Sequence, residues 1–119
     1  MGVTAIKKFV NETNYSWIIH NLENPTQTFE LKTGQALDYD MWIPWCAVPF
    51  EWNKKRIVLI PKMDKKEDWS IWQRAAVDGD RVRAWHNWQE PNPLIHGDAS
   101  VDGNRNLHIR ETELFMVRV

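Results

Sequence analysis

Apolar and polar residues alternate with a period of two over short stretches along most of the chain, which is the pattern of β-strands and not of amphipathic helices. In residues 28–32, for example, Phe29 and Leu31 are flanked by polar side chains, as expected for a half-buried strand. Residues 57–60 are apolar without a break, as expected for a strand buried on both faces. The pattern predicts strands over residues 3–10, 15–22, 28–32, 36–42, 56–60, 69–77, 81–88, 106–111 and 113–119.

Polar turn residues separate these predicted strands at fairly even spacing. Asn11 to Asn14 is one such turn, and the Asp78-Gly79 pair between two apolar runs predicts a tight hairpin. We find no internal repeat and no linker. The sequence therefore predicts an all-β fold over residues 1–119, a single-domain antiparallel β-sandwich or flattened β-barrel of about eight or nine short strands.

Two segments depart from the strand pattern. Residues 41–52 hold three tryptophans together with Pro44 and Pro49, and each proline fixes φ and pushes the preceding residue toward an extended conformation. We therefore expect a rigid Trp-rich loop at 41–52 without helix. Residues 89–105 contain two prolines and two glycines, and we expect a long loop there, of the kind that often carries function.

Length and charge narrow the class of protein. A chain of 119 residues is the usual size of one domain, and its net charge of −1 lacks the basic excess that nucleic acid or an anionic membrane surface normally requires. No stretch approaches the roughly 20 apolar residues of a membrane helix. The amino-terminal residues do not resemble a signal peptide, so we expect a cytoplasmic protein without a membrane span.

The common catalytic and metal-binding motifs are missing from the sequence. There is no phosphate-binding glycine loop, the four histidines follow no compact metal-ligand spacing, and Cys46 is the only cysteine. Asp98 and Asp102 lie near Gly103 but lack the spacing of a calcium loop, so we interpret them as turn residues. We expect neither a metal nor a cofactor.

The most unusual feature of the composition is its eight tryptophans. A core of this size cannot readily enclose eight indoles and give each N–H group a partner, so some should lie at the surface. Strand context predicts that Trp17, Trp69 and Trp72 pack between the sheets. The remaining five lie in or beside loops and are candidate ligand-binding residues: Trp42, Trp45, Trp52, Trp85 and Trp88.

Polar residues next to these tryptophans indicate the type of ligand. Asp40, His86, Asn87 and Gln89 could hydrogen-bond to a hydroxyl-rich molecule whose ring stacks on an indole. We therefore expect a lectin-like module that binds a small neutral ligand of glycan type. An exposed aromatic surface would also offer an interface for a homodimer.

A small cofactor-independent enzyme, of cyclase or isomerase type, is the alternative. Asp38, Asp40, Glu51 and His86 could supply an acid and a base around a tryptophan-lined cavity that holds an apolar substrate. A closed pocket with a buried acid would favour catalysis, whereas an open tryptophan surface would favour binding. Both hypotheses predict that Trp45→Ala and Trp88→Ala weaken ligand binding without unfolding the protein.

Overall fold

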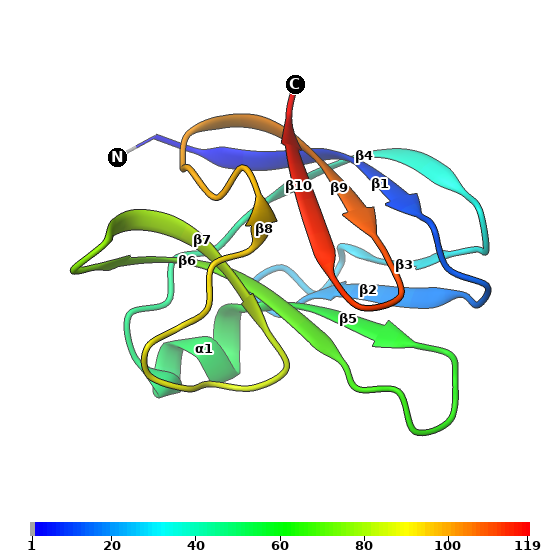
Figure 1. Ribbon diagram of the computed structural model, residues 1–119, viewed down its shortest axis with the longest axis horizontal. Coiled ribbons are helices and arrows are strands. Elements are labelled where there is room, and N and C mark those ends of the chain that lie inside the picture. Colours follow the sequence, from blue (N-terminus) through cyan, green and yellow to red (C-terminus); the bar gives the residue numbers. More distant parts are fainter. Residues whose placement is uncertain (1) are drawn as a thin grey trace.

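Two five-stranded sheets face each other in the structure, a computed structural model that describes residues 2–119 (Figure 1). The strands are β1 (Thr4–Asn11), β2 (Trp17–Asn21), β3 (Thr28–Leu31), β4 (Ala36–Trp42), β5 (Ile57–Pro61), β6 (Trp69–Ala76), β7 (Gly79–Trp85), β8 (His96–Gly97), β9 (Gly103–Ile109) and β10 (Leu114–Arg118), with one helix, α1 (Pro49–Lys55). All nine predicted strands are present, and the two-residue β8 is added. The prediction of an all-β sandwich is confirmed.

The order of strands is β4-β1-β9-β10-β8 in the upper sheet of Figure 1 and β3-β2-β5-β6-β7 in the lower sheet. Every pair in the lower sheet is antiparallel. In the upper sheet, β1 is antiparallel to β4 but parallel to β9, and β8 is parallel to β10. The upper sheet is therefore mixed. The chain passes through the lower sheet before β9 returns to pair with β1.

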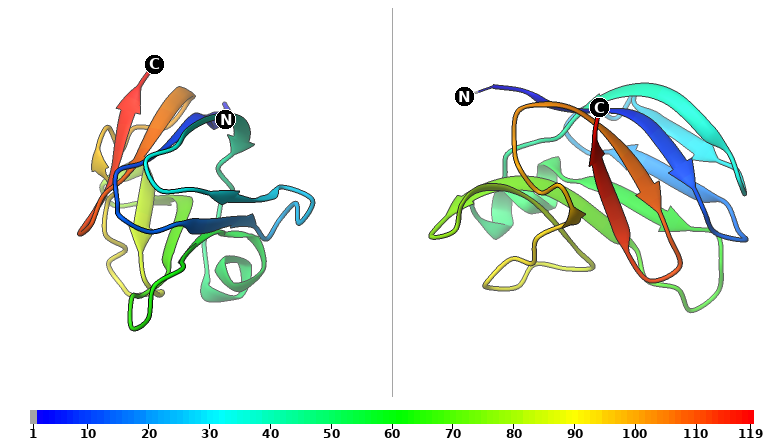
Figure 2. Two further views of the ribbon diagram at one scale, coloured as in Figure 1. Left: turned by 90° about the vertical axis from the view of Figure 1, so that its right-hand side faces the viewer. Right: turned by 45° about the horizontal axis from the view of Figure 1, so that its top comes forward.

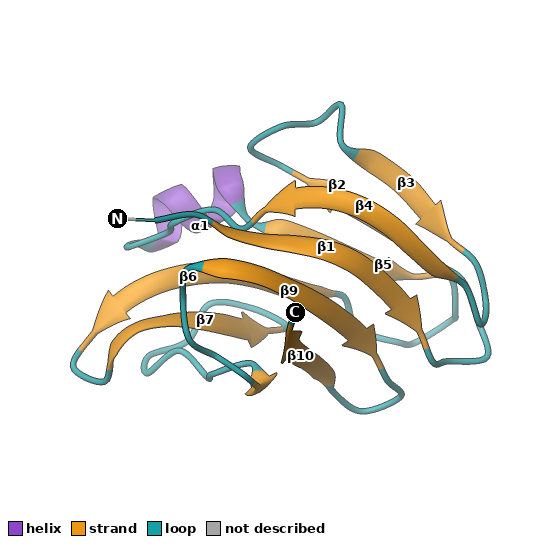
Figure 3. Ribbon diagram, turned by 90° about the horizontal axis from the view of Figure 1, so that it is seen from above, coloured by secondary structure: helices purple, strands orange, loops and turns teal. Residues whose placement is uncertain are grey.

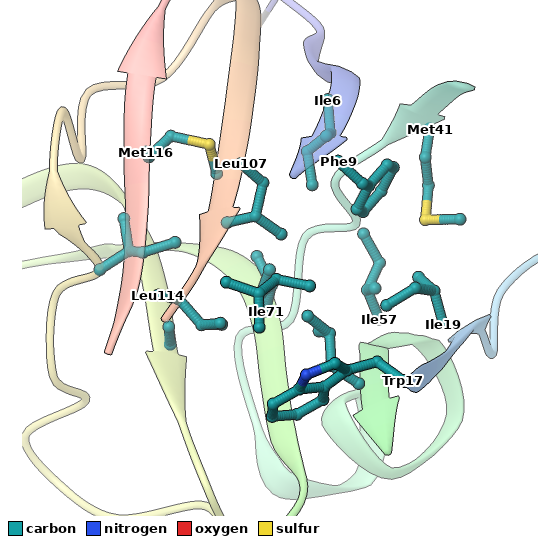
Figure 4. Packing of buried hydrophobic residues seen from close by; sticks show 14 of the residues in the cluster. Ile6, Phe9, Trp17, Ile19, Met41, Ile57, Ile71, Leu107, Leu114 and Met116 are labelled. Atoms are coloured by element: carbon teal, nitrogen blue, oxygen red, sulfur yellow. The ribbon is translucent and has the colours of Figure 1, made fainter. Parts of the chain in front are cut away.

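The hydrophobic core lies between the two sheets and is built from alternate residues of their strands (Figure 4). The upper sheet contributes Phe9 and Met41, and the lower sheet contributes Ile19 and Ile71, all fully buried. Removing such side chains from water is the main favourable term in folding. Trp17 packs within this core, as its strand position predicts.

Polar groups at one end of the core satisfy the indole of Trp17. Its N–H donates to the Thr13 hydroxyl at 2.9 Å, and that hydroxyl donates to Asn11 Oδ1 at 2.7 Å. The Asn11 amide in turn donates to the backbone oxygens of Tyr15 and Lys32. This buried network joins the end of β1 to β2 and to the residue after β3, so the polar turn at 11–14 also connects the two sheets.

Helix α1 is a correction to the expected extended conformation of residues 41–52. Pro49 occupies the first turn of the helix, where its missing N–H costs no hydrogen bond and its fixed φ suits the helix. Glu51, in the first turn, accepts the N–H of Ala47 at 2.8 Å and so ties the residue before the N-cap to the helix. The seven-residue α1 lies on the outer face of the lower sheet (Figure 2). No helix among residues 2–119 is long and apolar enough to cross a membrane.

Gln73 of β6 fixes the path of the chain between β4 and α1. Its buried side chain donates to the Ile43 oxygen at 2.5 Å and accepts the Thr4 hydroxyl at 2.7 Å. Its backbone N–H donates to the Pro44 oxygen, and its oxygen accepts the Cys46 N–H. One amide therefore links both sheets and directs residues 43–46 around the edge of the sandwich toward the outer face of the lower sheet.

The predicted hairpin between β6 and β7 is present, with Gly79 at a φ of +93°. The free edge of β7 is covered by part of the predicted 89–105 loop, because the Val82 N–H donates to the Ala99 oxygen and Val82 accepts the Ile95 N–H. Arg83 is buried beneath this segment and forms two hydrogen bonds with the Asp78 carboxylate, at 2.7 and 2.9 Å. The segment therefore protects a sheet edge.

Substitution of Asp78 tests the importance of this ion pair. Hydrogen bonds from Arg83 hold the pKa of Asp78 below its usual range, so the pair stabilises the fold above the unfolded-state pKa of about 3.9. That stabilisation is lost as the pH falls through the lower, folded-state pKa. We expect Asp78→Asn to reduce the melting temperature at neutral pH, with a difference from wild type that shrinks as the pH falls below about 4.

Asp80→Asn is the matched control, because Asp80 lies in the same hairpin and is exposed. Thermal unfolding of the three proteins between pH 2 and pH 7 makes the comparison. Equal melting temperatures for wild type and Asp78→Asn at neutral pH would contradict the expected role of the pair.

Candidate functional site

The structure does not bring the five predicted ligand-binding tryptophans into one platform. Trp52 and Trp88 pack on the outer face of the lower sheet, whereas Trp85 lies near Trp69 at the end of β7. Trp42 and Trp45 lie at and beyond the end of β4. These three places are described in turn, since each offers different chemistry.

The first place is a second core, formed by Trp52, Trp72 and Trp88 and called here the outer tryptophan cluster. The rings of Trp52 and Trp72 meet edge to face at 5.9 Å, and Trp88 stacks on Trp72 at 6.0 Å. Arg56 covers the Trp52 ring at 3.9 Å. Trp52 is only 8% exposed, so most of its surface is unavailable to a ligand.

Trp72 corrects the expectation that it packs between the sheets. It is fully buried, but it belongs to the outer tryptophan cluster, whereas its neighbour Ile71 belongs to the core between the sheets. Alternation along β6 requires this, because successive side chains point to opposite faces. The buried N–H groups of Trp52 and Trp72 have no hydrogen-bond partner within residues 2–119, so enclosing these indoles leaves donors unpaired.

The second place is a hollow of about 350 Å³ beside the indole of Trp42, called here the Trp42 hollow. Trp42 is 62% exposed because it points outward from β4, while Met41 points into the core. The other residues that line the hollow are Asp40 of β4 and four residues from the end of β2 and the β2–β3 connection. This connection lies beside the end of β4 (Figure 3). All five residues are polar: Asn21, Glu23, Asn24, Gln27 and Asp40.

Hydrogen bonds fix the polar side chains of the Trp42 hollow. Asn21 Nδ2 donates to Gln27 Oε1 at 2.9 Å, and Gln27 Nε2 donates to the backbone oxygen of Asp40 at 3.1 Å. The Asp40 carboxylate pairs with Lys7 at 3.0 Å. Asn24 Oδ1 accepts the Thr26 hydroxyl, which orients the Asn24 amide. Four of the five polar side chains around the exposed indole, all except Glu23, therefore have interactions that orient them before any ligand arrives.

A further hollow of about 320 Å³ lies next to the Trp42 hollow and shares Trp42 and Glu23 with it. Trp45 and Pro44 give it a more apolar wall, and Lys55 contributes a charge. The predicted residues Trp42, Trp45 and Asp40 thus lie in two adjoining hollows.

The third place is an open hollow of about 580 Å³ lined by Trp69, Trp85, His86 and Asn87, called here the Trp69–Trp85 hollow. The rings of Trp69 and Trp85 meet edge to face at 6.0 Å, and His86 lies 4.2 Å from Trp69. His86 Nδ1 is 2.9 Å from the Asp68 oxygen. Because a carbonyl oxygen can only accept, Nδ1 carries a proton and donates there.

The four candidate catalytic residues lie in different parts of the molecule. Asp38 pairs with Lys8 on the outer face of the upper sheet, Asp40 lines the Trp42 hollow, and His86 lines the Trp69–Trp85 hollow. Glu51 lies in the first turn of α1, where the Ala47 N–H lowers the pKa of its carboxyl group. A general acid needs the opposite shift. Within residues 2–119, no cluster of three His, Cys, Asp or Glu side chains could hold a metal ion.

Sequence reasoning missed several residues of the Trp42 hollow. Asn21 lies near the end of a predicted strand, and Glu23, Asn24 and Gln27 lie between two predicted strands, so nothing in their spacing connects them with Trp42. The connection arises because β3 and β4 lie at corresponding edges of the two sheets. The predicted Gln89 is exposed, and its backbone oxygen accepts the Asn92 amide.

Comparisons of the chain with protein-family models, with curated proteins and with solved structures found no match.

Replacement of tryptophans separates the structural indoles from the exposed one. Trp88→Ala removes a ring that stacks on Trp72 and lies beneath Arg74, and we expect it to lower the free energy of unfolding by about 1–3 kcal/mol, less than for a fully buried tryptophan. Trp42→Ala should change this free energy by less than about 0.5 kcal/mol. Urea unfolding followed by circular dichroism measures both. A larger loss for Trp42→Ala would place its indole in the core.

The reactivity of Cys46 tests whether the region beside the outer tryptophan cluster is closed. Cys46 is fully buried, and burial raises the pKa of its thiol to about 12. The thiolate is the reactive form, so we expect negligible alkylation by iodoacetamide at pH 8 in the folded protein and rapid alkylation in urea. Mass spectrometry counts the modified chains. Rapid alkylation without urea would show that this region opens readily.

Proposed function

We propose that this protein is a ligand-binding β module and that the Trp42 hollow binds a neutral ligand of glycan type. The observation that carries the proposal is the exposed indole of Trp42, surrounded by five polar side chains. The C–H face of a pyranose ring can stack on an indole, and each sugar hydroxyl displaced from water needs a donor or an acceptor.

The polar side chains of the Trp42 hollow can supply both. The Asn24 Nδ2 group can donate, while the carboxylates of Glu23 and Asp40 can accept two hydroxyl groups. The Thr26 hydroxyl orients Asn24, and Lys7 pairs with Asp40, which reduces the entropy that these two side chains lose on binding. A volume of about 350 Å³ lies at the small end of the range of ligand pockets, so we propose one or two sugar rings beside Trp42.

Exposure of the acidic groups favours binding over the enzyme alternative. The side chains of Asp38 and Asp40 are 86% and 56% exposed, so water rather than a closed pocket surrounds them. The open surface beside Trp42 therefore supports a binding module.

The experiment is a calorimetric titration with a panel of neutral mono- and disaccharides, followed by the same titration of variants. We expect a saturable response from at least one sugar. Trp42→Ala should weaken its binding by more than about tenfold, because the stacking surface is lost, and Asn24→Ala by about fivefold through loss of a hydrogen bond.

Phe50→Ala is the matched control, because Phe50 is 66% exposed but does not line the Trp42 hollow. It should bind the sugar as the wild type does. The proposal fails if no sugar binds, or if Phe50→Ala and Trp42→Ala weaken binding equally.

A further inference from the structure

The Trp69–Trp85 hollow continues into a small apolar pit. The pit has a volume of about 70 Å³ and shares Trp69, Trp85 and Thr112 with the hollow. The rest of its wall is formed by His96 and by apolar residues from β7, the 93–95 segment and β10: Ala84, Pro93, Leu94, Ile95 and Leu114. Of these, Ala84, Ile95 and Leu114 are buried. The site thus combines a wide polar mouth with a narrow apolar end.

Hydrogen-bond donors without partners surround the mouth. Neither Trp69 nor Trp85 donates its indole N–H to another group of residues 2–119, and Asn87 and Thr112 also keep their side-chain groups free there. These donors are therefore free to bond to a ligand that occupies the hollow.

The charges at the mouth leave one cation without a partner. Lys66 pairs with Glu111 at 3.0 Å, and Glu67 lies 3.4 Å from His86 Nδ1. Lys65 lines the same hollow and makes no ion pair within residues 2–119. The two lysines and two glutamates of the mouth balance in formal charge, and Lys65 is the lysine that is free to attract an anion.

We propose that the Trp69–Trp85 hollow and its pit form a second binding site, for a small carboxylic acid with a short branched alkyl tail. The tail enters the pit, which both indoles help to line, and the carboxylate stays in the mouth, where it accepts hydrogen bonds from the free donors and is attracted by Lys65. This site is independent of the Trp42 hollow and of the function proposed for it.

The size of the pit limits the tail. A cavity of about 150 Å³ lined by apolar side chains holds benzene, so one of about 70 Å³ takes a smaller group such as isopropyl. The carboxylate cannot enter the pit, because burying an unpaired charge among apolar side chains is costly. The ligand is therefore oriented by its own two ends.

The test uses isovalerate as the probe and the indole N–H signals in proton–nitrogen NMR spectra as the readout. Isoamyl alcohol keeps the branched tail without the charge, and acetate keeps the charge without the tail. We expect isovalerate to shift the signals of Trp69 and Trp85, assigned with single Trp→Phe variants, and to leave that of Trp42 unchanged. Both reference compounds should bind at least about threefold more weakly.

Two variants examine the two ends of the site. Thr112 is exposed, so Thr112→Leu should fold normally while its larger side chain blocks the entrance to the pit and weakens isovalerate binding by more than about tenfold. Lys65→Gln should weaken it by about two- to fivefold. Lys62→Gln is the control, because Lys62 does not line the hollow and instead pairs with Glu30.

Three outcomes would overturn the proposal. Isovalerate could leave the Trp69 and Trp85 signals unmoved, or it could bind no better than acetate and isoamyl alcohol. Thr112→Leu could also bind isovalerate as the wild type does while its spectrum stays folded, which would show that the pit is not used.

Discussion

Burial of β6 on both faces is the constraint from which most of this structure follows. Successive residues of a strand point to opposite faces, so Ile71 enters the core between the sheets while Trp72 points away from it. An indole left on the outer face would expose a large apolar surface. Helix α1 covers this indole with Trp52, and residues 86–92 cover it with Trp88. The lower sheet therefore has a core on each side.

The same arrangement determines where the open sites lie. Because the outer face of β6 is occupied by the outer tryptophan cluster, the two hollows that tryptophans line lie toward the edges of the sandwich. One edge carries the Trp42 hollow, where the β2–β3 connection meets β4, and another carries the Trp69–Trp85 hollow. Gln73 helps to position both cores. Its side chain bonds to Ile43 and its backbone to Pro44 and Cys46, and these bonds direct the chain toward α1.

Local sequence patterns predict the strands well and the sites poorly, for physical reasons that individual residues illustrate. The alternation of Phe29 and Leu31 with polar residues, or the turn at Asp78-Gly79, depends on neighbours in the sequence and is therefore readable. Pro49 was misread because a proline that breaks a helix in its interior favours one in its first turn.

The composition of the sites depends on pairing between distant segments. Trp42 was predicted as an exposed indole from its loop context, but Asn24 meets it only because two sheet edges adjoin. Trp52 and Trp72 lie in segments about twenty residues apart, and their contact follows from the path of α1. No local pattern contains that information, so the sequence indicated the kind of residues involved but not their grouping.

The parallel pairing of β1 with β9 has a consequence for the order in which the protein can fold. β1 occupies the second position of its sheet and needs β9 as one of its two neighbours, yet β9 begins at Gly103. On a ribosome, which makes about 5–20 residues per second, β1 must therefore wait several seconds with an open edge. During that interval, a β1–β4 pair can accept a strand from another chain. Synthesis of many chains close together therefore favours misassembly.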